Sequence, residues 1–531
     1  MKKTGKRKLK KFKLYPATSF ILLTIFIIIL SAILSFFDVQ ATYNKLDLNN
    51  IQLKSTLVVV KNMLSYDGVK YIISNAAINF ISFTPLSMML ISLLGISVAV
   101  SSGFFDIFIK RNLGEINTKF ITFLLLFIAT ISSLINEVGY AVLIPLGAIF
   151  YQAKGRNPLV GIVTAFCGVS FGYGISVFIG SLDISLIPYT QASARLIDPT
   201  FHISLTSNLF IIIVLSIILS IIGTFAIENF VTKSLKRKRE RKDISYTSEI
   251  EIIDYINEEQ TKIETNKYEK KGLKYAYISS IIVIFIFIYM LIPNLPFSGI
   301  LLDMKEKTYV NQLFGLNSYL QDGFTYMVAI FFLIIGIAYG IGAKTIKSDK
   351  DIINGSNQYM KNIVEIITII FFASQFIAVF KETNIGTIIT AWGANIISEL
   401  SWGAIPLIII ILLVGTIADL FITTPTSKWI ILAPVVVPKL MQLNVSPQFS
   451  QMLLRASDSM ANGITPLLAG FAIYIGYLNI YNKDKENPIT IKKSISYIMP
   501  YFGIISLAWI VLIIGWYITG LPLGPNVYPT I

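Results

Sequence analysis

The stretch ADLFITTPTSKWIILAPVVVPKLMQLNVSP, residues 418–447, is apolar but repeatedly interrupted by proline. Within it, Trp429 is followed by Pro434 five residues later, and Pro447 comes thirteen residues after that proline. The same two spacings recur in NEVGYAVLIPLGAIFYQAKGRNP, residues 136–158, at Tyr140, Pro145 and Pro158. The repeated spacing indicates that two distant parts of the chain are built on one plan.

The whole chain is too apolar for a soluble protein. It has 531 residues, of which 54% are hydrophobic and 14% are charged, whereas about 25% of the residues of soluble domains are charged. Apolar runs of ~20 residues, which is the length a helix needs to cross a hydrocarbon core of ~30 Å, recur along the sequence. These runs do not alternate between apolar and polar residues as the strands of an outer-membrane barrel do. The sequence therefore predicts an all-α polytopic membrane protein.

Charged segments divide the chain into two membrane halves. A basic N-terminus, residues 1–15, precedes a first apolar run at 16–38. A cleaved signal peptide is disfavoured there, because the run is longer than a typical signal and lacks a clear small-residue cleavage site. The charged segment 233–272 is typical of a cytoplasmic linker. It separates a first half, residues 16–232, from a second half, residues 273–531.

The distribution of lysine predicts the topology. The loop NKDKENPITIKK, residues 482–493, contains four lysines, whereas the C-terminal PLGPNVYPTI contains no charged side chain. By the positive-inside rule the N-terminus is cytoplasmic and the C-terminus lies outside, which requires an odd number of crossings, about nine. The net charge of +14 follows from basic membrane flanks and does not imply nucleic-acid binding. After the first span we expect further spans to begin near Pro85, Thr118, Val138, Ser204, Tyr275, Thr325, Lys361, Gly403 and Ser494.

A polar, glycine- or serine-rich break follows each proline-spaced stretch. The breaks are GVSFGYGISVFIGSLD, residues 168–183, and RASDSMANGITP, residues 455–466. Non-helical backbone at membrane depth is tolerated where it lines a polar cavity or binds a ligand. Paired breaks in two halves are typical of the substrate site of a repeat-built transporter. The plainer alternative is that glycine and proline only kink ordinary membrane helices.

Ionisable residues that flank or enter these breaks are few: Glu137, Asp183, Asp419, Arg455 and Asp458. A charge at the bilayer centre costs at least ~2.5–3.5 kcal/mol, so such residues usually pair or perform a function. Arg455 and Asp458 lie one helical turn apart and could form a structural ion pair. Alternatively, Asp458 could join oxygens of Ser459, Asn462 and Thr465 around Na⁺, or could relay a proton.

Several ordered motifs together resemble one known family, the p-aminobenzoyl-glutamate transporter (AbgT) family, over essentially the full length of the chain. They are GYAVLIPLGAIFYQAKGRNPLVGI (139–162), GVS and IGSLD (within 168–183), YGIGAKTIKSDKDI (339–352), FFASQFIAVF (371–380), SKWIILAPVVVP (427–438), and SPQ with the pattern R-x-x-DS-x-x-N-x-x-TP (446–466). The resemblance implies an inverted-repeat, homodimeric carrier of the bacterial inner membrane, with two re-entrant hairpins in each protomer.

The resemblance also implies ion-coupled movement of p-aminobenzoyl-glutamate, p-aminobenzoate-like acids or sulfonamides, with no cofactor other than a coupling ion. Family positions tied to transport correspond to Asp183, Trp429, Pro447, Arg455, Asp458 and Pro466. The chain departs from the family in the site itself. Asp419 replaces the usual Asn, Asn136-Glu137-Val138 replace Ser-Asp before Gly-Tyr, Gly174-Ile175-Ser176 replace Ser-Ala-Asn, and Leu468, Ala469 and Gly470 replace the proline and aromatic residue after the last Thr-Pro.

These residues suggest a division of roles. Asp419 and Asp458, with Asn462 and Ser459, are expected to bind the coupling cation, and the two carboxylates would be its metal ligands if that cation is Na⁺. Trp429 is expected to offer its aromatic face to the substrate ring, while Arg455 attracts a substrate carboxylate. The expected substrate-binding set is Trp429, Arg455, Asp183, Thr426, Pro447 and Pro466.

Four other functions are alternatives to this one. A carrier of dicarboxylates or other organic anions from the same superfamily remains the main alternative, and a passive channel is a lesser one. A metal hydrolase is disfavoured because the chain has a single histidine, His202, a single cysteine, Cys167, and no HExxH motif. ATP-driven transport is disfavoured because YGIGAK lacks the Lys-Ser/Thr of a nucleotide-binding loop.

Overall fold

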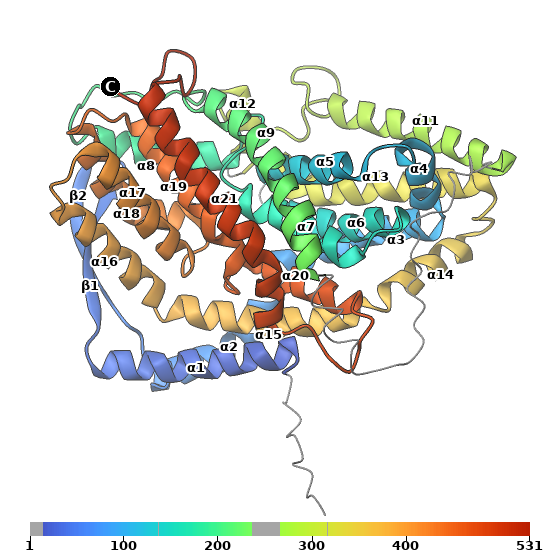
Figure 1. Cartoon of the computed structure of the whole chain (residues 1–531), viewed down its shortest axis with the longest axis horizontal. Helices are drawn as coiled ribbons and strands as arrows, with labels where there is room; N and C mark the ends of the chain where they lie inside the picture. Colours follow the sequence, from blue (N-terminus) through green and yellow to red (C-terminus); the bar gives the residue numbers. More distant parts are fainter. Residues whose placement is uncertain (1–13, 136, 236–265, 316) are drawn as a thin grey trace, which may run out of the picture.

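The computed structural model describes residues 14–135, 137–235, 266–315 and 317–531 (Figure 1). The basic N-terminus up to residue 13 and residues 236–265 of the expected linker lie outside the described residues. The elements of the first half are α1 (Pro16–Phe36), β1 (Gln40–Asp47), β2 (Gln52–Val59), α2 (Tyr66–Ile81), α3 (Thr84–Ser101), α4 (Phe104–Leu113), α5 (Thr118–Ile131), η1 (Ser132–Ile135), α6 (Val138–Ala153), α7 (Pro158–Phe171), α8 (Ser181–Ala194), α9 (Leu209–Ala226) and the π-helix η2 (Ile227–Val231).

The second half begins with a helix that starts inside the predicted linker, because Asn266 and Glu269 form a capping box there. Its elements are α11 (Lys267–Tyr289), α12 (Tyr309–Phe314), α13 (Tyr319–Ala343), α14 (Asp349–Met360), α15 (Ile363–Glu382), α16 (Ile385–Glu399), α17 (Ala404–Asp419), α18 (Pro425–Met441), α19 (Pro447–Ala461), η3 (Asn462–Ile464), α20 (Ala469–Ile480) and α21 (Ile491–Thr519).

Within the described residues, nine helical segments are long and apolar enough to cross a membrane, which agrees with the predicted number. They are Pro16–Phe36, Tyr66–Ser101, Thr118–Ile135, Leu209–Leu235, Lys267–Tyr289, Tyr319–Ala343, Ile363–Glu382, Pro447–Ile480 and Ile491–Thr519. The expected full spans at Val138 and Gly403 are wrong. Helices α6 and α17 have 16 residues each, about 24 Å, which is short of the ~30 Å of a hydrocarbon core.

The segment between the first two spans contains a small sheet. Strands β1 and β2 form an antiparallel hairpin in which Gln40 pairs with Val59 and Asp47 with Gln52. The hairpin contacts α16 and α18. Ser65 then caps α2 by accepting a hydrogen bond from the Gly68 amide at 3.1 Å. The fold is mainly helical, as predicted, with this one small sheet in the described part of the chain.

The repeated proline spacing corresponds to two helical hairpins, α6–α7 and α18–α19. Pro158 and Pro447 each stand at the start of the second helix, where a missing amide hydrogen costs nothing. Their preceding residues cap those helices: Asn157 accepts from the Leu159 amide at 3.0 Å, and Ser446 accepts from the Phe449 amide at 3.3 Å. Each hairpin helix has 14 to 17 residues and is by itself short for a full crossing. Helix α19 reaches that length only together with η3 and α20, in the segment Pro447–Ile480.

Close backbone contact holds the first hairpin together. A Cβ atom added to Gly161 would lie 2.1 Å from the Gly147 carbonyl oxygen. We expect Gly161→Ala to destabilise the protein by about 1–3 kcal/mol, because the helices must separate to admit the methyl group. Gly503→Ala is the matched control, since Gly503 lies within α21 with no atom within 4 Å of an added Cβ. Thermal unfolding of the purified protein in detergent measures both, and equal unfolding temperatures would contradict the prediction.

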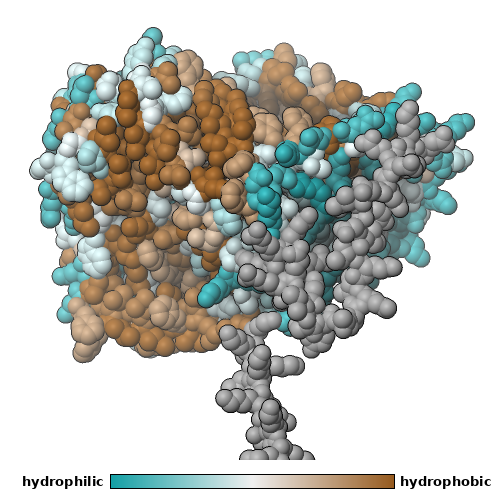
Figure 2. Space-filling model, viewed as in Figure 1, coloured by the Kyte–Doolittle hydropathy of each residue, from teal (hydrophilic) through white to brown (hydrophobic). Residues whose placement is uncertain are grey.

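The outer surface is largely apolar, as expected for helices surrounded by lipid. Figure 2 shows hydrophobic residues over much of the viewed face, with hydrophilic residues toward the right, where α14 lies. Large apolar side chains are exposed along α1 and α11, for example Phe26, Ile29, Ile281 and Phe285. Helix α19 is the opposite case, because all fifteen of its residues are buried. The polar residues of α19 are thus enclosed by the other helices.

Candidate functional site

Arg455 of α19 joins the second hairpin to the break that follows the first. Its Nε donates to the Gly174 carbonyl oxygen at 2.7 Å, and its Nη1 donates to Asp183 Oδ1. Asp183 lies in the first turn of α8, where its other oxygen accepts from the Gly180 amide at 3.0 Å. Both side chains of this ion pair are almost completely buried. The guanidinium is therefore held by two groups that are distant in the sequence.

The alternative of an ion pair between Arg455 and Asp458 is wrong. Arg455 pairs with Asp183, while Asp458 Oδ1 accepts a hydrogen bond from Lys428 Nζ at 2.5 Å. Arg455 and Asp458 lie one helical turn apart on α19, but their partners come from other helices, Asp183 from α8 and Lys428 from α18. The sequence analysis overlooked Lys428. A lysine in the first turn of an apolar helix, directly before Trp429, was the signal that could have revealed it.

Lys428 binds both carboxylates that were expected to hold a cation. Its ammonium donates to Asp419 Oδ1 as well as to Asp458 Oδ1. The three residues come from the end of α17, the first turn of α18 and the last turn of α19. All three side chains are at most 1% exposed. Two carboxylates and one ammonium leave this triad with a formal charge of −1.

Several acceptors of the triad and of the two breaks have no hydrogen-bond partner. They are buried oxygens of four residues: Asp419 Oδ2, Asp458 Oδ2, Asn462 Oδ1 and Ser176 Oγ. A buried polar atom without a partner costs about 1–3 kcal/mol, so such atoms are retained where they have a use. Carboxylate and amide oxygens are suitable ligands for a hard cation. In the described ranges no three His, Cys, Asp or Glu residues cluster as a metal site, so neutral oxygens would have to complete the coordination.

The remaining predicted residues lie on α18, on α19 and in the segment that follows α19. Trp429 is buried, and its indole Nε1 donates to Thr190 Oγ1 of α8 at 2.8 Å. Ser459 Oγ accepts from the Gly174 amide at 2.8 Å. Pro447 is buried at the start of α19, whereas Thr426 and Pro466 are half-buried. Trp429 and Arg455 thus already have partners within the protein, and Pro447 lies at the opposite end of α19 from Asp458.

A cavity of about 440 Å³ lies beside this junction and was not anticipated from the sequence. The segment that joins α17 to α18 forms one wall, through Phe421 to Thr424 and Ser427. Because Ser427 directly precedes Lys428, a ligand in the cavity would touch the segment that connects two members of the triad. Glu137, which the sequence analysis noted without a role, also lines it.

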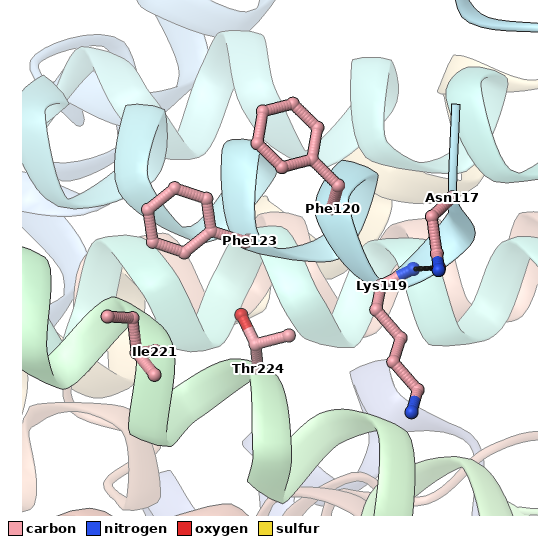
Figure 3. A pocket seen from close by; sticks show the side chains of 6 residues that line it. All are labelled: Asn117, Lys119, Phe120, Phe123, Ile221 and Thr224. Atoms are coloured by element: carbon pink, nitrogen blue, oxygen red, sulfur yellow. Dashed lines mark hydrogen bonds between the residues drawn. The ribbon is translucent and has the colours of Figure 1, made fainter. Parts of the chain in front are cut away.

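A second hollow, about 360 Å³, lies between α5 and α9 (Figure 3). Phe120 and Phe123 of α5 line it together with Ile221 and Thr224 of α9, and Lys119 is the one charged residue in its lining. Phe120 and Ile221 belong to the exposed apolar surface. None of the predicted site residues lines this hollow, so the larger cavity is the better candidate for a polar ligand.

A helical protein with multiple membrane spans, two short-helix hairpins and a buried cluster of charges where they meet belongs to the class of membrane transporters. Residues 13–531 match the sequence profile described as "AbgT putative transporter family". The chain is therefore a member of the AbgT family, whose characterised relatives are transporters and not enzymes.

Among its relatives, the p-aminobenzoyl-glutamate transport protein of Escherichia coli (strain K12) is 28% identical over 515 residues, which cover 97% of this chain and 94% of that protein. The YdaH transporter of Alcanivorax borkumensis has a solved structure. It is 26% identical to this chain, the match covers 96% of this chain and 100% of the YdaH chain, and the TM-score is 0.48. MtrF of Neisseria gonorrhoeae, whose structure is described with a class of antimetabolite efflux pumps, is 28% identical to this chain. The match covers 97% of this chain and 98% of the MtrF chain, with a TM-score of 0.47.

Proposed function

We propose that this chain is a secondary active transporter of p-aminobenzoyl-glutamate or related aromatic acids and sulfonamides, coupled to a gradient of protons or Na⁺. The observation that carries the proposal is the buried triad of Asp419, Lys428 and Asp458 at the junction of broken helices. Membership of the AbgT family and the name of the Escherichia coli relative support the substrate class. The coupling follows from the charge of the triad.

The triad needs one more positive charge to become neutral. Lys428 neutralises one of the two carboxylates, so a formal charge of −1 remains in the interior. Exposing an uncompensated charge to the hydrocarbon core costs at least ~2.5–3.5 kcal/mol. One proton or one Na⁺ removes that cost, and the oxygens of Asp419 and Asp458 that Lys428 does not bind are available to take it. A moving hairpin would therefore cross the membrane more readily with the cation bound.

Arg455 and Trp429 act mainly as positioning residues in this scheme. Arg455 connects α19 to Asp183 and to the backbone of the break, and Trp429 connects α18 to α8. These contacts tie the second hairpin to the break after the first, so the two broken segments would move together. A direct contact with substrate would require either side chain to exchange its present partner.

We also propose a membrane location, a topology and an oligomeric state for the protein. The lysine-rich flanks favour a cytoplasmic N-terminus and an external C-terminus in a bacterial inner membrane. The family resemblance favours a homodimer. The exposed apolar faces of α1 and α11 are surfaces that lipid or a second protomer would cover.

The test is uptake of labelled p-aminobenzoyl-glutamate by liposomes that contain the purified protein. We expect saturable accumulation against a concentration gradient when either a pH gradient or a Na⁺ gradient is imposed, and equilibration only when both are absent. Succinate serves as the competitor that represents the dicarboxylate alternative. Accumulation of succinate with no uptake of the aromatic amide would contradict the proposal, and flux that never saturates would indicate a channel.

A further inference from the structure

The cavity of about 440 Å³ has two ionisable lining residues of opposite charge, Glu137 and Lys381. Lys381 lies near the end of α15 and is exposed, whereas Glu137 precedes α6 and is half-buried. The cation is therefore the more accessible of the two groups, and the carboxylate lies farther in. Among the described residues, no basic group lies within ion-pair distance of Glu137. Its carboxylate is thus available to a ligand.

The remaining walls combine aromatic rings with hydroxyl groups. Phe380 and Phe421 stack with their ring centroids 6.3 Å apart and their planes 20° from parallel, and Phe83 lines the cavity as well. Ser82, Thr84, Thr387, Thr423, Thr424 and Ser427 supply hydroxyls. Ligand pockets of proteins measure roughly 300–1,000 Å³ and are typically apolar with a few polar groups that orient the ligand. The volume of this cavity lies in that range, and its lining is more polar than that of a typical pocket, which suits a ligand with polar ends.

We propose that this cavity is the substrate site and that it selects an aromatic solute with an anionic group at one end and an N–H donor at the other. The ring packs against Phe380 and Phe421. Lys381 attracts the anionic group, and the Glu137 carboxylate accepts a hydrogen bond from the aryl amine. Glu137 is then a specificity-determining residue, because an acid without the amine leaves its carboxylate without a partner. This inference rests on the proposed transport of aromatic acids and identifies where the ring and its two ends are recognised.

The place of the cavity also connects substrate to the coupling ion. Its wall from Phe421 to Ser427 is the segment between Asp419 and Lys428. Thr465 fastens the start of that segment by donating a hydrogen bond to the Leu420 carbonyl oxygen at 2.8 Å. A substrate packed against Phe421 would therefore contact the segment whose backbone positions Asp419 and Lys428.

The experiment compares two ligands that differ only in the amine, p-aminobenzoate and benzoate, by isothermal titration of the purified full-length protein. We expect the unmodified protein to bind p-aminobenzoate about tenfold or more tightly than benzoate, because the loss of a hydrogen bond to a charged group typically weakens binding by at least that factor. In Glu137→Gln the ratio should fall toward one, mainly through weaker binding of p-aminobenzoate. In Lys381→Gln both acids should bind more weakly, by a similar factor, while aniline is unaffected. Glu399→Gln and Lys350→Gln, at exposed positions outside the cavity, are the matched controls.

Failure of this inference can be distinguished from failure of the proposed function. If the protein accumulates p-aminobenzoyl-glutamate but neither variant alters the preference for the amine or the affinity for the acids, the cavity assignment is overturned and the function stands. If the unmodified protein binds succinate and neither aromatic acid, the proposed function itself is overturned. Because the two variants probe opposite ends of the ligand, a folding defect in one leaves the other as a complete test.

Discussion

Asp458→Asn is expected to abolish gradient-driven accumulation while leaving downhill exchange of substrate intact. The substitution keeps the shape of the side chain and removes the charge that leaves the triad at −1, so transport no longer requires a cation. Loss of a contact to a charged group, worth about 1.5–3 kcal/mol, should lower cation affinity by at least about tenfold. The two readouts in liposomes are accumulation under an imposed gradient and exchange of labelled for unlabelled substrate without one.

These two readouts separate coupling from structural damage, which would reduce exchange and accumulation together. Asp349→Asn is the matched control, because Asp349 is an exposed aspartate in the first turn of α14. Accumulation by Asp458→Asn at the rate of the unmodified protein would show that Asp458 has no role in coupling. The charge of the triad would then not be what couples transport to a cation.

Arg455→Met should be the most destabilising single change at the junction. It leaves Asp183 as a buried carboxylate without its cation and removes the contact with the Gly174 carbonyl oxygen. Breaking a buried ion pair by removing one partner typically costs about 3–5 kcal/mol. Thermal unfolding of the purified protein in detergent measures the loss.

The double variant Asp183→Asn/Arg455→Met provides the control for that measurement. With no charge left unpaired, it should recover part of the lost stability, so the two substitutions together should cost less than the sum of their separate effects. Strictly additive effects would mean that the ion pair between Arg455 and Asp183 contributes no coupling. If Arg455→Met lowers the free energy of unfolding by less than about 1 kcal/mol, the ion pair of Arg455 contributes no more than an exposed ion pair does, which would contradict the prediction.

Lys428 changes how the expected cation site is understood. The sequence suggested two aspartates and neighbouring oxygens around a cation, and the structure places a tethered ammonium between those aspartates. A transported cation would share the carboxylates with this ammonium. Asp419, which replaces the usual family asparagine, then balances the charge of Lys428, so that Asp458 retains the need for an additional cation.

Features that depend on local sequence were predicted well. Hydropathy located most of the membrane-crossing helices, and the proline spacing located both hairpins, because helix length and the effect of proline at a helix start are properties of consecutive residues. The predictions failed where length decided the outcome. The apolar runs at Val138 and Gly403 form helices too short to cross. The β-hairpin of residues 40–59 was not predicted from the sequence.

By itself, the sequence determined the membrane class, the number of candidate crossings and most of the buried ionisable residues, but not Lys428, since hydrophobic burial follows from composition along short stretches. Only the tertiary structure decided which charges meet. Arg455 and Asp183 are 272 positions apart in the sequence, and Lys428 and Asp458 are 30 positions apart. The cavity likewise draws its walls from α2–α3, α6, α15–α16, the α17–α18 segment and the residues before α20. A buried charge is stabilised by whichever opposite charge the packing brings within a few ångströms, and that neighbour is set by how the helices pack, which no local spacing encodes.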